Sequence, residues 1–414
     1  MRLKTSTRIK VVHICVTDGG GAGLCCRKIS KSLKEEGIDS QIISMLKFTN
    51  DKDVTRVKWG IKWFIYRVLN KFLLFLQLPL TDRVKVIKLQ NKIKEPLSIP
   101  VSIFTSLHKH RLIQEADIIH LHSITGFIDY PTFFKNINKP IVWTLHDENI
   151  FNGLSHFSRT NIKNLKIDKK FYQIKLNSVS KPCDLGIVFL SKMMFNKFRE
   201  HEMIKGRPKT IINNPVDTNI FHSIDKKEAR IRLGLAQDAI VFIFVAAHID
   251  DPWKGLNKLI KAVELLNMHN AIILAVGKKK DSVIRPSFMK AIGPIYDNKL
   301  LVSAYSAADY FISASDQEAF AQTPIEAMSC GIPAILTPVS GTQELITEKN
   351  GILCTDTTVE AILQGIKLAL EKKYNPEEIR NDILARFSTK IIANKYIEFY
   401  KNILGQNNKT NILN

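Results

Sequence analysis

The chain has 414 residues, of which 45% are apolar and 24% are charged. This composition excludes a disordered protein, and the length exceeds what one hydrophobic core usually supports, so we expect two domains. The formal net charge of +21 indicates an anionic partner. Charge alone does not distinguish a nucleic acid, an anionic membrane surface and an anionic substrate.

The first half of the chain alternates short apolar runs with helical or loop segments. This alternation is typical of α/β proteins, in which helices connect parallel strands. The predicted strands cover residues 9–16, 38–45, 116–121, 140–145 and 185–190. Together they predict one doubly wound sheet.

A glycine run from Gly19 to Gly23 follows the first predicted strand and opens a helix. Glycine lets backbone amides approach a ligand closely, so Gly20 and Gly21 are candidate binding residues. The run lacks the GxGxxG spacing of dinucleotide-binding enzymes, and a flexible strand-to-helix turn is the alternative interpretation.

Residues 59–80 form an apolar and aromatic segment with helical character. Charged and amide side chains interrupt it, so it falls short of the roughly 18 uncharged residues that indicate a membrane-spanning helix. Two interpretations stay open. The helix lies on a membrane surface, or it is buried in the first domain with a narrow polar stripe.

Histidines close two of the predicted strands, His120 and His122 at one and His146 at the other. Residues two apart on a strand share one face, as some metal ligands do. We find no third ligand with suitable spacing, so we expect buried or site-lining histidines and no metal.

The second half repeats the alternation. Of its predicted strands, the first two begin near residues 241 and 271, the third ends at 315 and the fourth begins at 332. Its predicted helices cover about 254–267, 299–307 and 324–329. Residues 213–235 lose the apolar pattern and contain Asn-Asn-Pro, which predicts a linker between two domains.

Asp251, Pro252 and Lys254 open the first helix of this second series. Asp251 is a candidate N-cap and Pro252 suits the first helical position. A lysine there opposes the helix dipole, but it would be favourable beside a bound diphosphate. The alternative is a solvated surface lysine.

The segment Asp316–Gly331 places two carboxylates, Glu318 and Glu326, around a predicted helix start. Thr323 is a candidate N-cap, and the amides of the first turn suit a phosphate. Carboxylates accept hydrogen bonds from sugar hydroxyls, so the segment indicates a nucleotide-sugar site. As the alternative, Thr323 and Glu326 form a capping box and Glu318 is a solvated loop acid.

Six cysteines show no CxxC pair, and several lie in apolar runs where a reduced thiol packs as a small hydrophobe. The basic start of the chain leads into a short apolar run that ends in glycines, which favours a first strand over a signal peptide. We therefore expect a cytoplasmic protein.

The spacing Glu318-AFAQTPI-Glu326 resembles the donor site of the retaining, metal-independent glycosyltransferases of family 4. Segments that resemble the family in the expected order include IKVVHICVTDGGGAG, DIIHLHSITGF, PIVWTLHDENIFNG, IINNPVDTNIF, DDPWKG and ARFSTKIIANKYIEFY. The resemblance therefore covers most of the chain.

The resemblance implies the GT-B fold, an α/β architecture of two Rossmann-like doubly wound domains that face a central cleft. It implies an acceptor-side domain at 1–222, completed by a returning helix at 388–405, and a donor domain at 223–387.

The resemblance also implies roles for individual residues. Glu318 would contact the transferred sugar, and Glu326 would contact the nucleotide ribose. Lys254 would bind the donor phosphates, and a histidine placed like His146 would reach the donor sugar. The segment between the two carboxylates would contact the donor through Phe320, Ala321, Gln322 and Thr323.

One feature departs from the family pattern. Many relatives carry an arginine several residues before the lysine, whereas this chain has Ala247 and His248 in that neighbourhood. His248 can replace the contact if it is protonated or acts as a neutral donor. A catalytically inactive relative is therefore one alternative.

The sequence thus predicts a cytoplasmic glycosyltransferase, at the inner face of the membrane, with a nucleotide-sugar donor and a glycan or lipid-linked acceptor. We expect an anionic membrane surface as a partner, no nucleic acid and no cofactor. A nucleotide-sugar epimerase of the same fold and a basic nucleic-acid-binding protein are two competing hypotheses. No zinc-finger or aromatic-rich RNA motif supports the latter.

Overall fold

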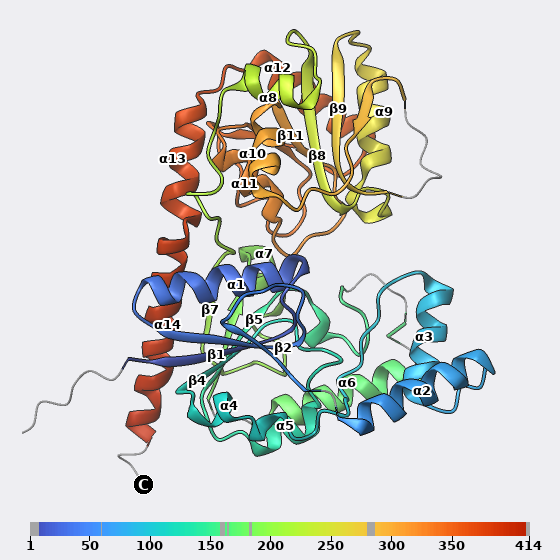
Figure 1. The fold of residues 1–414 in the computed structure, drawn as a ribbon, viewed down its shortest axis with the longest axis vertical. Coiled ribbons are helices and arrows are strands. Elements are labelled where there is room, and N and C mark those ends of the chain that lie inside the picture. Colours follow the sequence, from blue (N-terminus) through green and yellow to red (C-terminus); the bar gives the residue numbers. More distant parts are fainter. Residues whose placement is uncertain are drawn as a thin grey trace, which may run out of the picture. The chain divides into compact units, whose positions relative to one another are not determined.

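The computed structural model describes residues 8–58, 60–157, 162–163, 165–181, 184–279 and 286–410. The chain divides into two compact units (Figure 1). The first comprises Met1–Leu190, Phe195–Ile212 and Ala393–Asn414, and the second comprises Ser191–Met194 and Asn213–Ile392.

The first unit contains, within the described residues, a seven-stranded sheet. Its strands are β1 (Lys10–Thr17), β2 (Asp39–Leu46), β3 (Val54–Arg56), β4 (Ile118–Leu121), β5 (Ile141–Leu145), β6 (Leu185–Phe189) and β7 (Lys209–Ile211). The strand order is β3-β2-β1-β4-β5-β6-β7, and the pairings are parallel. The winding reverses between β1 and β4, which is where open α/β sheets bind ligands.

Helices accompany these strands along the chain. They are α1 (Gly20–Glu35), α2 (Ile61–Phe75), α3 (Asp82–Ile93), α4 (Arg111–Glu115), α5 (Tyr130–Asn136), α6 (Lys166–Val179) and α7 (Lys192–Phe198), with short 3-10 turns at Leu107–Lys109 and Asn149–Phe151. Helix α1 packs against β1 and β2, and α5 packs against α6.

The second unit contains a six-stranded parallel sheet in the described residues. Its strands are β8 (Ile240–His248), β9 (Ala271–Lys278), β10 (Met289–Ala291), β11 (Tyr310–Ser313), β12 (Ala334–Leu336) and β13 (Gly351–Leu353), in the order β10-β9-β8-β11-β12-β13. Its helices are α8 (Lys226–Leu233), α9 (Leu256–Leu266), α10 (Asn298–Ser306), α11 (Gln322–Ser329), α12 (Val359–Glu371) and α13 (Pro376–Phe387). Here the winding reverses between β8 and β11.

The apolar runs form strands because a parallel sheet covered by helices buries both of its faces. Every residue of β5 and of β6 is buried. In the second unit, Phe242, Ile273, Ile312 and Ile335 belong to one buried cluster that also includes side chains of α9 and α12.

The predicted fold class is confirmed, and every predicted strand lies within two residues of an observed one. The sequence prediction missed β3, β7, β10 and β13, which have three residues each. The linker prediction was wrong in part, because residues 226–233 form α8. The Asp225 side chain accepts a hydrogen bond from the amide of Glu228, and Gly234 ends the helix in the left-handed region.

The returning helix predicted at 388–405 is α14 (Thr389–Thr410), whose residues from Ala393 onward belong to the first unit. Its two buried tyrosines bind side chains of the sheet. The Tyr400 hydroxyl lies 2.6 Å from His120 Nδ1, and the Tyr396 hydroxyl lies 2.9 Å from Thr144 Oγ1. Gly186 of β6 permits this packing, since a Cβ there would lie 2.8 Å from Ile403.

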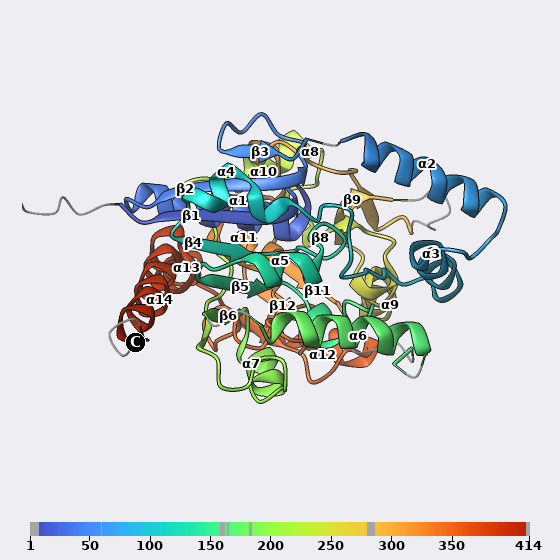
Figure 2. The ribbon, with the colours of Figure 1, turned by 90° about the horizontal axis from the view of Figure 1, so that it is seen from below.

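Helix α2 lies at the periphery of the first unit, apart from its strands (Figures 1 and 2). Most of its apolar side chains are exposed, with Phe75 at 83%, whereas Leu73 is buried. Exposed apolar residues of the segment also include Ile61, Phe64, Ile65, Val68, Leu69, Phe72, Leu76, Leu78 and Leu80. The interpretation of this helix as buried core is therefore wrong. No helix in the described part of the chain is long and apolar enough to cross a membrane.

Candidate functional site

The predicted donor-site residues of the second unit lie at the point where its sheet reverses direction. Lys254 follows β8, and Glu318 follows the neighbouring strand β11. Parallel neighbours end at the same edge of a sheet, so the loops after β8 and β11 meet beyond their carboxyl ends. This is the position at which doubly wound sheets bind ligands.

Lys254 and Glu318 form an ion pair although 64 residues separate them. The Lys254 Nζ lies 2.5 Å from Glu318 Oε1, which also accepts a hydrogen bond of 3.0 Å from the Ser315 hydroxyl. The Lys254 side chain is 32% exposed and that of Glu318 is 16% exposed. The pair thus presents an accessible cation beside a positioned carboxylate.

A short turn holds Lys254 in place. Residues Pro252–Lys254 form a 3-10 turn, and the side chain of Asp251 accepts a hydrogen bond from the amide of Trp253. Gly255 follows with φ +75°, and a Cβ at this position would lie 2.0 Å from the carbonyl oxygen of Ala314. The predicted cap at Asp251 is confirmed, but it caps this turn, and the α-helix itself begins at Leu256.

Helix α11 begins one turn after Glu318. It covers Gln322–Ser329, its N-cap is Ala321, and no side chain caps it. The prediction of Thr323 as N-cap was therefore wrong, and so was the capping-box interpretation of Glu326. Phe320 and Ala321 are buried in front of the helix, whereas Gln322 and Thr323 are partly exposed in its first turn.

Glu326 is 8% exposed, and its Oε2 accepts a hydrogen bond of 3.1 Å from the Tyr305 hydroxyl. Burial, and then the Glu326 carboxylate, raise the pKa of Tyr305 well above its usual value. Tyr305 is therefore protonated and donates to the carboxylate at every physiological pH. A buried hydrogen bond of this kind holds the carboxylate in one orientation.

His248 is the last residue of β8, and both Ala247 and His248 are exposed. The strand pairing with β9 is irregular between Val245 and His248. Where the resemblance implies an arginine, the chain thus has an exposed imidazole, and the strand partner of His248 is Lys278 of β9.

The remaining predicted site residues belong to the first unit. Gly20 and Gly21 are exposed at the start of α1, directly after β1, and Gly20 has φ +67°. A Cβ at Gly23 would lie 2.2 Å from the carbonyl oxygen of Thr17, so this glycine permits the close approach of α1 to β1. The prediction that the glycine run follows a strand and opens a helix is confirmed.

His146 directly follows β5 and is partly exposed. Its Nε2 lies 3.0 Å from Nδ1 of His122. The sequence prediction missed His13, whose Nδ1 lies 2.9 Å from Nε2 of His122. His13 lies on the first predicted strand, but only the strand order, in which His13 of β1 pairs with His120 of β4, brings it to the other histidines.

Asp147, which follows His146, organises the next loop. Its Oδ2 lies 2.6 Å from His156 Nδ1, and His156 Nε2 lies 2.8 Å from the Ser98 hydroxyl. Lys175 donates to the carbonyl oxygen of Asn149 at 2.6 Å, and burial lowers its pKa to about 7. These contacts fix the loop on which His146 stands, and none was predicted from the sequence.

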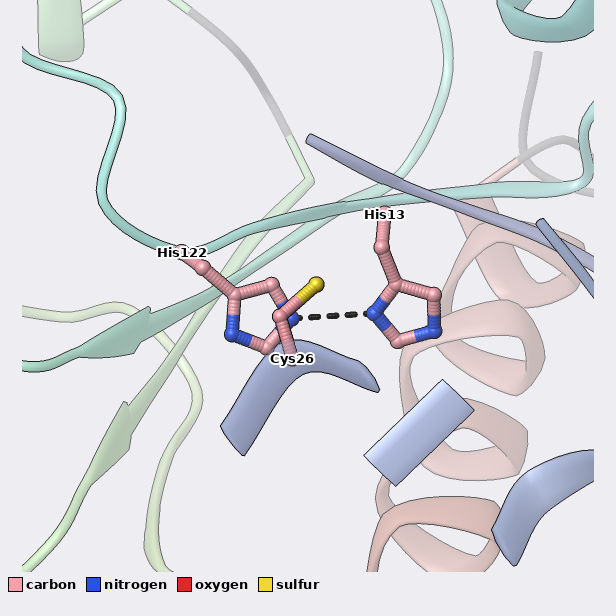
Figure 3. Close-up of side chains that lie close together, drawn as sticks. All are labelled: His13, Cys26 and His122. Atoms are coloured by element: carbon pink, nitrogen blue, oxygen red, sulfur yellow. Dashed lines mark hydrogen bonds between the residues drawn. The ribbon is translucent and has the colours of Figure 1, made fainter. Parts of the chain in front are cut away.

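Potential metal ligands among the described residues gather at His13, Cys26 and His122, whose ligand atoms lie within 4.8 Å of one another (Figure 3). The 2.9 Å contact between the two imidazoles is a hydrogen bond. Two nitrogens bound to one tetrahedral zinc ion would lie about 3.3 Å apart, farther than these two nitrogens. The observed distance therefore fits a direct hydrogen bond between the two rings.

The chain also contains an Asp-x-Asp triplet, Asp51-x-Asp53, a sequence pattern associated with metals. Both of its carboxylates form ion pairs with basic side chains of the protein. Asp51 lies 3.2 Å from the Arg27 guanidinium, and Asp53 forms an ion pair with Lys34.

Residues 225–385 match the family model of Glycosyl transferases group 1. They form a glycosyltransferase group 1 domain. This domain lies within the second unit and contains both the Lys254–Glu318 pair and Glu326.

Relatives with similar sequences include proteins that are named as glycosyltransferases. The chain is 23% identical to N-acetyl-alpha-D-glucosaminyl L-malate synthase of Bacillus anthracis, over 96% of this chain and 98% of that protein. It is 24% identical to a D-inositol 3-phosphate glycosyltransferase of Thermobispora bispora, over 54% of this chain and 55% of that protein.

Solved structures with the same fold match nearly the whole length of this chain. Sucrose-phosphate synthase of Thermosynechococcus elongatus has a TM-score of 0.67 at 18% identity and covers 96% of this chain and all of its own. Anabaena Alr3699/HepE in complex with UDP-glucose has a TM-score of 0.66 at 14% identity, covering 95% of this chain and 100% of its own. The chain therefore has the GT-B fold, as the sequence resemblance implied.

Proposed function

We propose that this protein transfers a sugar from a nucleotide diphosphate sugar to a hydroxyl acceptor, with retention of configuration at the anomeric carbon. The observation that carries the proposal is the ion pair of Lys254 and Glu318 at the carboxyl ends of β8 and β11. A cation and a carboxylate side by side suit a ligand that joins an anionic diphosphate to a polyhydroxylated sugar.

In this proposal, the second unit binds the donor. Lys254 leaves Glu318 to bind the diphosphate, and it stabilises the charge that develops on this leaving group. Glu318 then accepts hydrogen bonds from the transferred sugar. Glu326, held by Tyr305, accepts hydrogen bonds from the ribose hydroxyls.

The first turn of α11 supplies the second part of the proposed diphosphate site. Amides in the first turn of an α-helix have no partner inside the helix and favour anions. The first turn of α11 contains no acidic residue that would repel the ligand. Lys254 and these amides together provide the positive field for which other enzymes use a metal ion, so we propose transfer without a metal.

The first unit contributes Gly20, Gly21 and His146 in this proposal. The exposed glycines at the start of α1 let the ligand approach the backbone closely. His146 binds the donor sugar from the end of β5. None of these groups is a covalent nucleophile, and the catalytic contribution is positioning and electrostatic stabilisation.

We further propose that the acceptor is a lipid-linked glycan and that α2 brings the protein to the cytoplasmic face of a membrane. The exposed basic residues Arg67 and Lys71 lie among the exposed apolar side chains of α2, and Arg67 lies 5.0 Å over the ring of Trp63. A helix of this composition lies in the interface of an anionic bilayer. The GT-B neighbour WaaG is described as a glycosyltransferase of lipopolysaccharide biosynthesis, which supports a role in surface polysaccharide assembly.

Thermal stabilisation by a panel of UDP-, GDP- and ADP-sugars tests the donor proposal, and UDP-glucose is the first candidate because the Anabaena neighbour binds it. The nucleotide sugar that stabilises the protein is then incubated with the protein and a hydroxyl acceptor. The anomeric configuration of the product is determined by NMR. We expect retention, and the same rate with and without EDTA. Conversion of the donor into an isomer without an acceptor would establish the epimerase hypothesis instead.

A further inference from the structure

Four histidines gather in the first unit: His13 lies within β1, His120 and His122 lie at the end of β4, and His146 follows β5. Three of them, His13, His120 and His122, are buried, and His146 is partly exposed. The His120 ring lies 4.2 Å from that of His122 and 4.7 Å from that of His13, measured between ring centroids. These rings therefore form one packed group.

Hydrogen bonds connect three of the four in a row. His13 Nδ1 lies 2.9 Å from His122 Nε2, as the dashed line in Figure 3 shows, and His122 Nδ1 lies 3.0 Å from His146 Nε2. His120 stays outside the row, because its Nδ1 binds the Tyr400 hydroxyl and its Nε2 binds the Thr144 hydroxyl. Both of its nitrogens are occupied elsewhere.

Each imidazole in the row carries one proton at neutral pH. Burial lowers the pKa of His13 to about 3 and that of His146 to about 4, and it lowers the pKa of His122 well below the usual value. A neutral imidazole has one N–H donor and one bare nitrogen. Because His122 uses both nitrogens, the row has only two arrangements: all its bonds are donated toward His146, or all are donated toward His13.

The far end of the row distinguishes these arrangements. His13 Nε2 is buried and has no hydrogen-bond partner within the described structure. If the bonds ran toward His13, this nitrogen would be an unpaired buried N–H. If they ran toward His146, it would be an unpaired acceptor. Among buried backbone groups, N–H donors without a partner are rarer than acceptors without one. We apply the same preference to this imidazole, which favours donation toward His146.

We propose that His13 and His122 are positioning residues that fix the tautomer of His146, with its hydrogen on Nδ1. His146 Nε2 accepts from His122, so the partly exposed ring presents an N–H donor and no acceptor to its ligand. It binds a ligand oxygen that accepts a hydrogen bond, such as a sugar hydroxyl or a phosphate oxygen. The choice of a donor sugar as that ligand rests on the proposed function, whereas the tautomer does not.

The primary test is ¹⁵N NMR of the whole protein, because the chemical shift of an imidazole nitrogen distinguishes a protonated from a bare nitrogen. We expect His146 to carry its proton on Nδ1 in the wild-type protein without any ligand. A proton on Nε2 would overturn the proposal. We expect added Zn²⁺ to leave the spectrum unchanged. An ion bound to His13, Cys26 and His122 would replace the hydrogen bond between His13 and His122 and would therefore change the spectrum.

Variants separate positioning from folding. His13→Leu removes the donor at the start of the row and should leave His146 as a mixture of tautomers. Sugar transfer should fall about tenfold, which corresponds to about 1.4 kcal/mol, and the nucleotide affinity should be unchanged. His13→Gln keeps an N–H donor and should restore both properties. The matched control is His120→Gln, in the same packed group but outside the row, which should leave the tautomer of His146 unchanged.

Two results would refute the positioning role: an unchanged His146 tautomer in folded His13→Leu, or a shifted tautomer in His120→Gln. Failure of the proposed function is a separate outcome, because a protein that transfers no sugar still reports the tautomer in the wild-type spectrum.

Discussion

Substitution of Lys254 by alanine should weaken the binding of a nucleoside diphosphate by about 1.5 to 3 kcal/mol, which is about 10- to 150-fold in affinity. The loss for the nucleoside alone should be much smaller, because only the diphosphate contacts the ammonium group. The same substitution frees Glu318, whose carboxylate then repels the phosphates.

The magnitude follows from the position of the side chain. Two unit charges 4 Å apart attract by about 4 kcal/mol at the effective dielectric constant of a protein surface. Lys254 is one-third exposed, which weakens this attraction, and it must give up its contact of 2.5 Å with Glu318 to bind the ligand. The net effect therefore falls within the range of one charged hydrogen bond. Glu318→Gln removes the competitor, so it should retain or tighten diphosphate binding while sugar transfer falls.

Isothermal titration calorimetry with the nucleoside diphosphate and the nucleoside measures both effects. The matched control is Lys258→Ala, four residues along the chain, because Lys258 is also a half-buried lysine in an ion pair, 2.7 Å from Asp316. We expect less than a threefold change in this control. Equal losses for both ligands in Lys254→Ala, or equal losses in the two lysine variants, would refute a direct phosphate contact.

Three further predictions concern the ribose contact, acid stability and the membrane. Glu326→Ala should weaken binding of nucleotide and nucleoside alike, whereas Tyr305→Phe should mainly lower stability, by about 1 kcal/mol; an unchanged nucleotide affinity in Glu326→Ala would exclude the ribose contact. The native pKa values of His13 and His146, about 3 and 4, lie below the value near 6.5 of an unfolded histidine, so the unfolded chain binds more protons as pH falls from 6.5 toward 4. Each of these two histidines should lower the free energy of unfolding by up to about 1.4 kcal/mol for every pH unit in that window. A urea-unfolding midpoint equal at pH 7 and pH 5 would contradict this. The protein should float with anionic liposomes at low salt and less at high salt, and Phe75→Ser should remove part of the salt-resistant fraction; no flotation at low salt would refute membrane binding.

The sequence by itself determined the fold class, the long strands and the principal residues of the candidate donor site. Apolar runs of strand length identify buried parallel strands because both faces of such a sheet are covered. The carboxylates Glu318 and Glu326 and the Lys254-Gly pair were recognisable because each belongs to a short segment that resembles the donor site of the family 4 glycosyltransferases. Edge strands of three residues, such as β3 and β7, carry too short a run to be recognised.

Only the tertiary structure decided which of these groups meet. Strand order joins β8 to β11 and thereby pairs Lys254 with Glu318, and it joins β1 to β4 and places His13 beside His122. The exposure of α2 was likewise undetermined, because an amphipathic pattern does not specify whether its apolar face packs inward or outward. Spacing along the chain is local information, whereas these contacts depend on the order in which distant strands assemble into a sheet.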